Sequence, residues 1–117
     1  WERCLFKLKE EHTRRTRITA VFLQEINLTN PDKAKPIALE HGFYMFTNVI
    51  IRGQYKGGTA ILIPKNSIEA QQGESHHAAL ARVKSTIRCL PHGRGIACDT
   101  MVQGQLRRLA SVYAPVT

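Results

Sequence analysis

The stretch Ile18–Glu25, with the sequence ITAVFLQE, decides the fold class of this chain. It is a run of β-branched and apolar residues whose polar side chains gather at its end. Such a run predicts a strand that is buried on both faces. The preceding segment, Trp1–Thr13, places Leu5, Leu8 and His12 on one face among charged residues, which predicts an amphipathic helix. A helix that leads into a buried strand indicates a protein of mixed α and β structure.

Downstream of this stretch the pattern predicts mostly strands. A short helix or loop is expected first, and then about five strands, the later ones antiparallel. The expected strands are Phe43–Arg52, Thr59–Ile63, Arg82–Leu90, Ile96–Val102 and Leu106–Ala114, the last two joined as a hairpin over Gln103–Gln105. The expected irregular segments are Asn27–Pro36 (loop or helix start), Ile37–His41 (a helical turn ending at Gly42), Gly53–Gly58 (turn) and Ser67–Ala79 (exposed loop).

The chain of 117 residues is basic, with 17 Lys and Arg against 9 Asp and Glu and a net charge of +8. Such a surplus favours polyanionic partners, because each neutralised phosphate releases condensed counterions. Charge alone does not choose between DNA, RNA, anionic lipid and a merely soluble surface. The longest apolar run, Ala60–Pro64, has the length of a strand, so no membrane association is expected.

The N-terminal segment and the number of cysteines indicate the cellular location of the chain. The segment Trp1–Arg17 mixes charges into every turn and has no apolar core of a signal peptide. The odd number of cysteines (Cys4, Cys89 and Cys98) favours free thiols in a reducing compartment. An intracellular location, the nucleus included, is therefore expected. A first residue of Trp1 in place of Met predicts a natural start that lies upstream.

The strongest chemical signal is Glu25, which follows Leu23 and Gln24 at the end of the first predicted strand. A carboxylate at the end of a buried strand costs free energy unless it is paired or binds a cation. Mg²⁺ favours one or two carboxylates together with water and substrate phosphate. The alternative is that Glu25 caps the following loop or pairs with a lysine.

Two weaker signals lie further along the chain. Tyr113 precedes Ala114-Pro115, where the chain leaves the last predicted strand, so its phenol could donate to a phosphate oxygen. A half-buried edge tyrosine would look the same in sequence. The pair Gly57-Gly58 precedes a strand but lacks the Gly-Lys-Ser/Thr of a phosphate-binding loop, so it indicates a tight turn.

Taken together, four blocks stand in one order at a familiar spacing. They are VFLQE (residues 21–25), GGTAILI (57–63), GRGI (93–96) and LASVYAP (109–115). This arrangement resembles the endonuclease/exonuclease/phosphatase superfamily, and most of all the apurinic-endonuclease-like domain of non-LTR (LINE-type) retrotransposon proteins. The resemblance covers the chain from about Thr19 onward.

The resemblance implies roles for three residues. Glu25 matches the family's metal-binding glutamate, which holds Mg²⁺ (or Mn²⁺) against the scissile phosphate, and Tyr113 matches a tyrosine that hydrogen-bonds near that phosphate. Gln24 would steady Glu25. The implied fold is an α/β (α+β) four-layer α-β-β-α sandwich, like that of DNase I, and the implied partner is DNA. A reverse transcriptase domain in the parent protein is also implied.

The sequence departs from the family in several places. The family's first strand, which ends in an Asn of the metal site, has no match before Trp1. Neither the Asp-x-Asn block nor the Ser-Asp-His block, which orient the attacking water and complete the acid/base contacts, has a match. Residues 1–117 are therefore expected to be a single truncated domain, mostly one mixed sheet with a flanking helix. Its sheet would lack a partner sheet, and it would show little or no activity alone.

The cysteines and histidines, and the N-terminal arginine cluster, allow other interpretations. Cys89 and Cys98 with His92, His76 and His77 faintly suggest zinc, but the spacing fits no paired Cys motif, and apolar strand positions favour two core cysteines. The cluster Arg14, Arg15 and Arg17 could grip phosphates or complement a helix end.

The sequence is also compatible with two other functions. One is a non-catalytic basic module that binds nucleic acid or a partner protein, which the net charge favours. Against it stands Glu25, because a phosphate-binding surface gains nothing from a carboxylate. The other keeps the superfamily and changes the substrate, for example a phosphatase of phosphoinositides.

Overall fold

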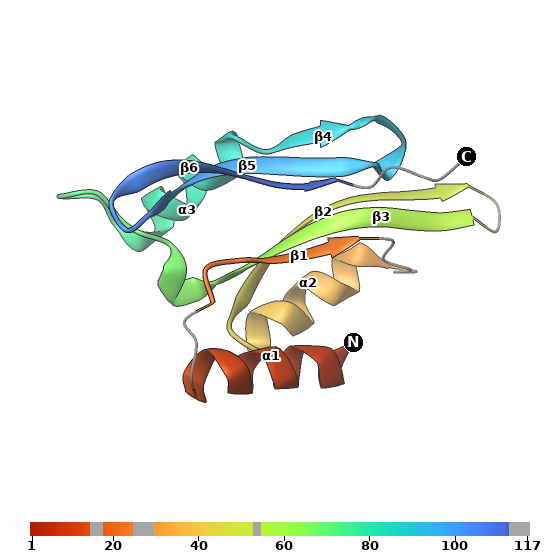
Figure 1. The fold of residues 1–117 in the computed structure, drawn as a ribbon, viewed down its shortest axis with the longest axis horizontal. Helices are drawn as coiled ribbons and strands as arrows, with labels where there is room; N and C mark the ends of the chain where they lie inside the picture. The colour runs from red at the N-terminus through yellow and green to blue at the C-terminus, as the bar shows by residue number, and fades with distance from the viewer. Residues whose placement is uncertain (15–17, 25–29, 53–54, 113–117) are drawn as a thin grey trace.

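Helices and strands occupy most of the chain. This computed structural model describes residues 1–14, 18–24, 30–52 and 55–112 (Figure 1). The elements are α1 (Glu2–Arg14), β1 (Val21–Gln24), α2 (Pro31–Glu40), β2 (Phe43–Arg52), β3 (Tyr55–Pro64), α3 (His76–Ser85), β4 (Arg88–Leu90), β5 (Gly95–Val102) and β6 (Gln105–Val112), with short 3-10 turns η1 (Lys65–Ser67) and η2 (Pro91–Gly93). None of the helices in these ranges is long and apolar enough to span a membrane.

The described strands form two three-stranded antiparallel sheets. The N-terminal sheet has the order β1-β3-β2, and the C-terminal sheet has the order β4-β5-β6. The prediction of mixed α and β structure is confirmed, but the prediction of mostly one mixed sheet is wrong. Two residues separate β2 from β3, and two separate β5 from β6. Connections that short join antiparallel neighbours only.

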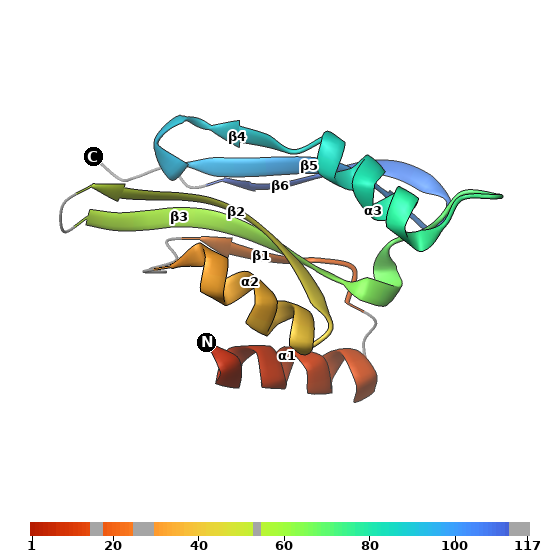
Figure 2. The same ribbon diagram turned by 180° about the vertical axis from the view of Figure 1, so that it is seen from behind.

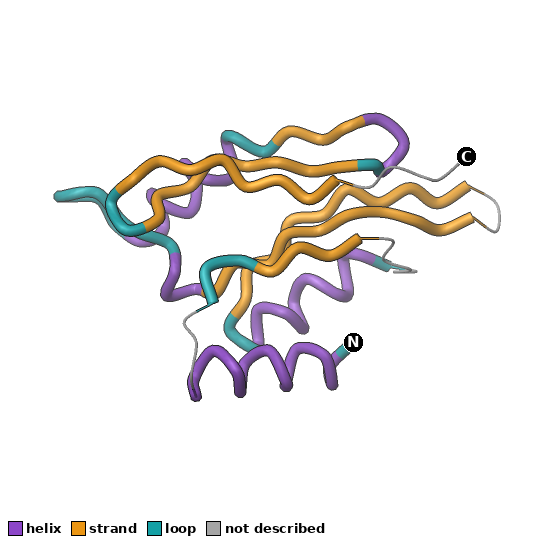
Figure 3. The backbone as a smooth tube through the Cα atoms, viewed as in Figure 1, coloured by secondary structure: helices purple, strands orange, loops and turns teal. Residues whose placement is uncertain are grey.

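The two sheets lie face to face, with helices on one outer side (Figure 1). α1 and α2 cover the outer face of the N-terminal sheet, and α3 lies beside the space between the sheets (Figure 2). Figure 3 shows the strands of the C-terminal sheet on the side of the molecule opposite α1 and α2, with the N-terminal sheet between them. The expectation of a sheet without a partner sheet is wrong, because the apolar inner faces of these two sheets cover each other.

The core consists of two clusters, one on each face of the N-terminal sheet. β3, the central strand, supplies both, since Ala60 and Leu62 point to one side and Ile61 and Ile63 to the other. The helix-side cluster is Leu5, Ala34, Ala38, Phe43, Met45, Ala60 and Leu62. The inter-sheet cluster is Phe46, Ile61, Ile63, Ile68, Ala79, Val83, Ile96 and Cys98.

The strand predicted at Ile18–Glu25 is shorter and more exposed than expected. Of the described residues 18–24, β1 covers Val21–Gln24, at the edge of its sheet, and Phe22 is 45% exposed. The prediction of burial on both faces is therefore wrong for β1. That environment belongs to β3, where every residue from Gly57 to Pro64 is buried.

α2 begins within the segment Asn27–Pro36, for which a loop or a helix start was predicted. The Asn30 side chain accepts a hydrogen bond from the Asp32 backbone N–H at 3.1 Å and caps the helix, and Pro31 stands in its first turn. Of the two alternatives predicted for the Asn-Pro pair, a loop or a helix start, the structure has the helix start. The predicted end at Gly42 is confirmed, and this residue has the left-handed φ of 91° that glycine adopts without strain.

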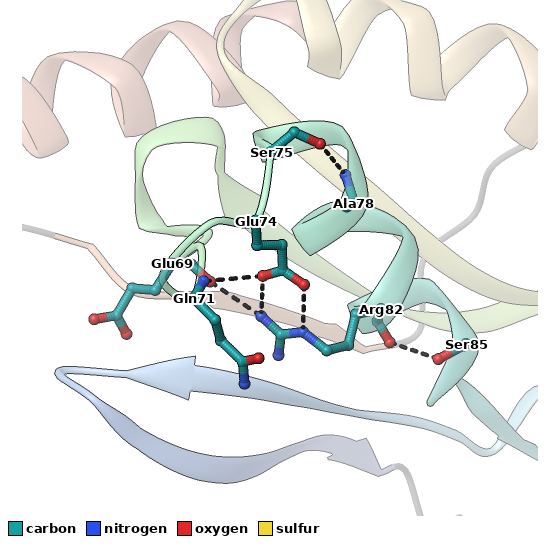
Figure 4. Close-up of polar contacts among 7 residues, drawn as sticks. All are labelled: Glu69, Gln71, Glu74, Ser75, Ala78, Arg82 and Ser85. Atoms are coloured by element: carbon teal, nitrogen blue, oxygen red, sulfur yellow. Dashed lines mark hydrogen bonds and ion pairs between the residues drawn. The ribbon is translucent and has the colours of Figure 1, made fainter.

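α3 replaces a predicted loop and strand. The Ser75 hydroxyl accepts from the Ala78 N–H at 3.1 Å and caps a helix that runs through Ser85 (Figure 4). Ala79 and Val83, four residues apart, are buried on its inner face. The strand predicted from the alternation at Arg82–Leu90 is wrong for most of that segment, because only its last three residues form a strand.

Candidate functional site

The ends of β1 and β6 lie together and are joined by two hydrogen bonds. The Gln24 side-chain amide donates to the Val112 carbonyl at 2.6 Å. The Ser111 hydroxyl donates to the Leu23 carbonyl at 3.0 Å. Both strands run toward the same end of the molecule (Figure 1). The edge of one sheet is thus tied to the edge of the other at this point.

A row of polar side chains crosses the N-terminal sheet at the same level. The strand register places Gln24 opposite Thr59 and Thr59 opposite Asn48. Thr59 has the same parity along β3 as Ile61, so this polar row (Gln24, Thr59 and Asn48) faces the C-terminal sheet. It forms one polar end of the inter-sheet space, whose other buried polar side chains include Thr100 of β5.

Asn48 joins the two sheets from the far side of the row. Its side-chain amide donates to the Leu90 carbonyl at 2.8 Å and to the Gly95 carbonyl at 2.7 Å. These two carbonyls flank the η2 turn that links β4 to β5. Gln24 and Asn48 therefore clamp the C-terminal sheet at β6 and at the β4–β5 turn, one from each edge of the N-terminal sheet.

Thr59 lies between these two amides and is fully buried. Its Oγ1 has no hydrogen-bond partner among the described residues. A buried hydroxyl without a partner costs free energy and is rare, so such an atom is a candidate for contact with a bound group. It is a neutral oxygen that could donate one hydrogen bond or accept others.

Gly58 sets the spacing of this region. A Cβ at this position would lie 2.6 Å from the Asn48 carbonyl oxygen and 2.9 Å from the Val49 Cα. Only glycine lets β2 and β3 approach this closely. The prediction that Gly57-Gly58 form a turn is wrong, because both residues lie within β3, opposite Ile50 and Val49.

The structure describes some of the predicted site residues and not others. Glu25 and Tyr113 lie outside the described residues, although each directly follows a residue of the Gln24–Val112 hydrogen bond in the chain. Gln24 is described, and its amide bonds the Val112 backbone. In the basic cluster, Arg14 ends α1, while Arg15 and Arg17 lie outside the described residues.

Three residues at this end of the molecule were missed: Asn48, Thr59 and Ser111. Ser111 is buried in β6, a strand that is otherwise mostly exposed and polar. Asn48 and Thr59 are polar residues within apolar strands, and Thr59 is buried. That pattern was a usable signal, because a polar residue in a buried strand needs a partner. The partners, however, come from the other sheet, and the sequence order does not show which strands face each other.

The cysteines have contrasting environments. Cys98 is fully buried in the inter-sheet cluster, as predicted. Its pKa is raised to about 11, first by burial and then by the neighbouring Asp99 carboxylate. The prediction of a core position is wrong for Cys89, which is exposed because β4 is a three-residue edge strand.

Three ion pairs between described residues lie away from the strand ends, two on Asp99 and one on Glu74. On the outer face of the C-terminal sheet, Asp99 accepts hydrogen bonds from Arg88 at 3.0 Å and Arg108 at 3.1 Å, which lower its pKa, Arg108 first. Beside α3, the two carboxylate oxygens of Glu74 accept from the Arg82 guanidinium at 2.9 and 3.1 Å (Figure 4). That guanidinium lowers the pKa of Glu74. These pairs stabilise local structure, and they occupy the carboxylates of Asp99 and Glu74.

The described residues contain no group of three or more His, Cys, Asp or Glu side chains that could hold a metal ion. The polar row supplies neutral amide and hydroxyl groups only. Comparison of the chain with models of protein families, with curated proteins and with solved structures found no match.

Proposed function

We propose that this chain is part of a Mg²⁺-dependent endonuclease that cleaves phosphodiester bonds in DNA, of the kind carried by non-LTR retrotransposons. One observation carries the proposal. The hydrogen bonds Gln24–Val112 and Ser111–Leu23 hold together the two strand ends that lead into Glu25 and Tyr113. The described parts of two blocks that resemble the superfamily, residues 21–24 and 109–112, therefore meet at one end of the fold.

The layered arrangement supports the same proposal. Two helices, a sheet and a facing second sheet correspond in order to three layers of the α-β-β-α sandwich of the DNase I type. In such folds, ligands gather where strands end, because the loops there are free to carry polar groups. The polar row lies at that end here.

In this proposal each residue has a chemical role. Glu25 would supply the carboxylate ligand for Mg²⁺ (or Mn²⁺), which when bound polarises a phosphoryl oxygen. Oxygen donors suit such a cation, and the unpartnered Thr59 hydroxyl is of that type. Tyr113 would donate to a phosphate oxygen, and Gln24 would fix the spacing of the two strand ends through Val112.

The activity of this chain alone should be weak. A single carboxylate at the strand ends leaves the attacking water without a base, and neither water-orienting block of the superfamily is matched in the sequence. A test should therefore measure metal binding as well as cleavage.

The experiment is an NMR titration of the labelled chain with Mn²⁺, followed by nicking of supercoiled plasmid. Paramagnetic broadening should centre on the amides of Gln24 and Val112, and Glu25→Gln should remove it. The matched control is Glu40→Gln, a carboxylate at the far end of α2. Broadening that persists in Glu25→Gln, or that centres elsewhere, contradicts the proposal.

The alternative function is a non-catalytic basic module that binds nucleic acid. The net charge of +8 favours it, as do the exposed Arg88 and Arg108, which share one carboxylate. DNA affinity measured with and without Mg²⁺ separates the two. Under the endonuclease proposal Glu25→Gln weakens Mg²⁺-dependent binding, whereas for a basic module it leaves binding unchanged or tighter.

A further inference from the structure

A cavity of about 500 Å³ lies along the open edge of β2, on the side of the molecule away from β1. Its floor is Phe43–Phe46. α2 contributes Lys35, Pro36 and Leu39 to one wall, and Lys84 and Ile87 form the other. Figure 2 shows β2 at this edge of its sheet, with α2 on one side of it and α3 on the other.

The floor is the edge of a strand and not the face of a sheet. Successive side chains of a strand point to opposite faces, so four consecutive residues line a cavity only when it lies against the strand's edge. Phe43 and Met45 belong to the helix-side cluster, whereas Phe46 belongs to the inter-sheet cluster. Both kinds line this cavity.

The backbone of this edge has unpaired groups. The Lys65 N–H donates to the Gly42 carbonyl at 2.9 Å, and antiparallel alternation then directs the main-chain groups of Tyr44 and Phe46 toward β3. Those of Phe43 and Met45 point away from β3, into the cavity. Pro64 stands opposite Phe43 and has no N–H to give, which agrees with this alternation. Within the described ranges β2 pairs with no strand except β3.

The rim carries more positive than negative charge. Lys35 and Lys84 are exposed on opposite walls, and no salt bridge between described residues involves either. Among the described residues that line the cavity, Asp32 is the one carboxylate. An apolar floor between two lysines complements a ligand with an apolar body and acidic flanks.

We propose that the open edge of β2 receives an extended peptide segment of a partner protein, which adds a fourth strand to the N-terminal sheet. Phe43 and Met45 exchange main-chain hydrogen bonds with it, an apolar side chain enters the cavity, and acidic side chains lie near Lys35 and Lys84. A helix would leave the unpaired groups of the strand edge unused, because its own backbone is satisfied internally. This site is independent of the proposed endonuclease site.

The first test titrates the labelled full chain with an acetylated and amidated peptide of alternating Glu and Val or Leu residues. The amide signals of Phe43 and Met45 should shift most, and their hydrogen exchange should slow. Two further peptides carry N-methyl groups on one or the other edge of the strand. The peptide methylated on the edge that faces β2 should bind about tenfold more weakly than the unmethylated peptide, or worse, because it cannot donate hydrogen bonds to β2. The peptide methylated on the opposite edge should bind like the unmethylated peptide. Equal binding of both methylated peptides overturns the proposal.

The second test changes the rim. The double variant Lys35→Glu with Lys84→Glu should weaken binding of the acidic peptide by about three- to tenfold at low salt. It should also favour the matched peptide with Lys in place of Glu. Lys33→Glu, an exposed lysine of α2 that does not line the cavity, is the control and should change binding little. An equal effect of Lys33→Glu overturns the charge argument. Dodecanoate serves as a small amphiphilic probe. If it shifts the amide signals of the cavity residues while neither peptide does, the proposal of a peptide ligand is overturned and the cavity binds small amphiphiles.

Discussion

The two sheets differ in how many of their faces are covered. The N-terminal sheet packs against α1 and α2 on one side and against the C-terminal sheet on the other. The outer face of the C-terminal sheet carries the Arg88–Asp99–Arg108 pairs instead, and within the described residues no helix packs on it. The central strands of the two sheets differ in burial accordingly. β3 is buried at every position from Gly57, whereas burial in β5 alternates.

The number of covered sheet faces, and not a central position in the sheet, therefore decides whether a strand has a continuous or an alternating pattern of apolar residues. β3 and β5 are both central strands. Only β3 has apolar neighbours above and below, so only β3 has a continuous apolar run. β5 sets Ile96 and Cys98 inward and Asp99 outward, the pattern of a sheet with one covered face.

The largest expected effect is on the shared core. Ile61→Ala deletes a fully buried side chain between the two sheets and should lower the free energy of unfolding by about 2–5 kcal/mol. Leu106→Ala, on a residue of β6 that is 64% exposed, should change it by no more than about 0.5 kcal/mol. Urea unfolding followed by circular dichroism measures both. Similar losses for the two variants would refute the assignment of the core.

A second prediction separates the inner position Cys98 from the edge position Cys89. With a pKa raised to about 11, only about one Cys98 thiol in a thousand is ionised at pH 8, and burial hinders access further. Iodoacetamide should therefore label Cys4 and Cys89, which are exposed, and leave Cys98 nearly unmodified. Mass spectrometry of the digested chain gives the extent at each site. Labelling in urea should make all three react, and rapid labelling of Cys98 without urea would mean that the sheets do not close over it.

The third prediction concerns the contact that joins the sheets. Asn48→Ala removes the donor to the Leu90 and Gly95 carbonyls and should cost about 1–3 kcal/mol, because it leaves two acceptors without that partner. The control is Asn66→Ala, whose side chain accepts one exposed hydrogen bond from His12. If the two substitutions prove equally mild in urea unfolding, the Asn48 clamp contributes nothing to the joining of the sheets.

The strands with the clearest residue patterns were predicted well. Phe43–Arg52 is confirmed with both bounds, and the hairpin of β5 and β6 is confirmed with small differences at its ends. These segments succeed because their apolar residues are dictated by local sheet packing. α1 is confirmed for the same reason, since Leu5 packs on α2 and the sheet.

The failures share a physical cause, which is tertiary context. β1 and β3 have similar apolar runs, but β1 is an edge strand and is half exposed. The division into two sheets depends on which strands pair, and a run of residues does not encode its partner. The same holds for the site: Gln24 was singled out only as a neighbour of Glu25, and its bond to Val112, 88 positions away, comes from the meeting of two sheets.

The smallest expected effect lies on the outer face of the C-terminal sheet. Arg108 and Arg88 lower the pKa of Asp99, so the ionised carboxylate stabilises the fold above its unfolded pKa of about 3.9. That contribution is lost as the pH falls through the lowered pKa of the folded state. Asp99→Asn should therefore lower the urea midpoint slightly at pH 7, and the difference from the original chain should shrink in acid and at high salt, which screens exposed charges. A difference that persists at low pH would show that Asp99 acts through packing or hydrogen bonding that does not need its charge. The outer face would then resemble the covered faces more closely than its exposed arginines indicate.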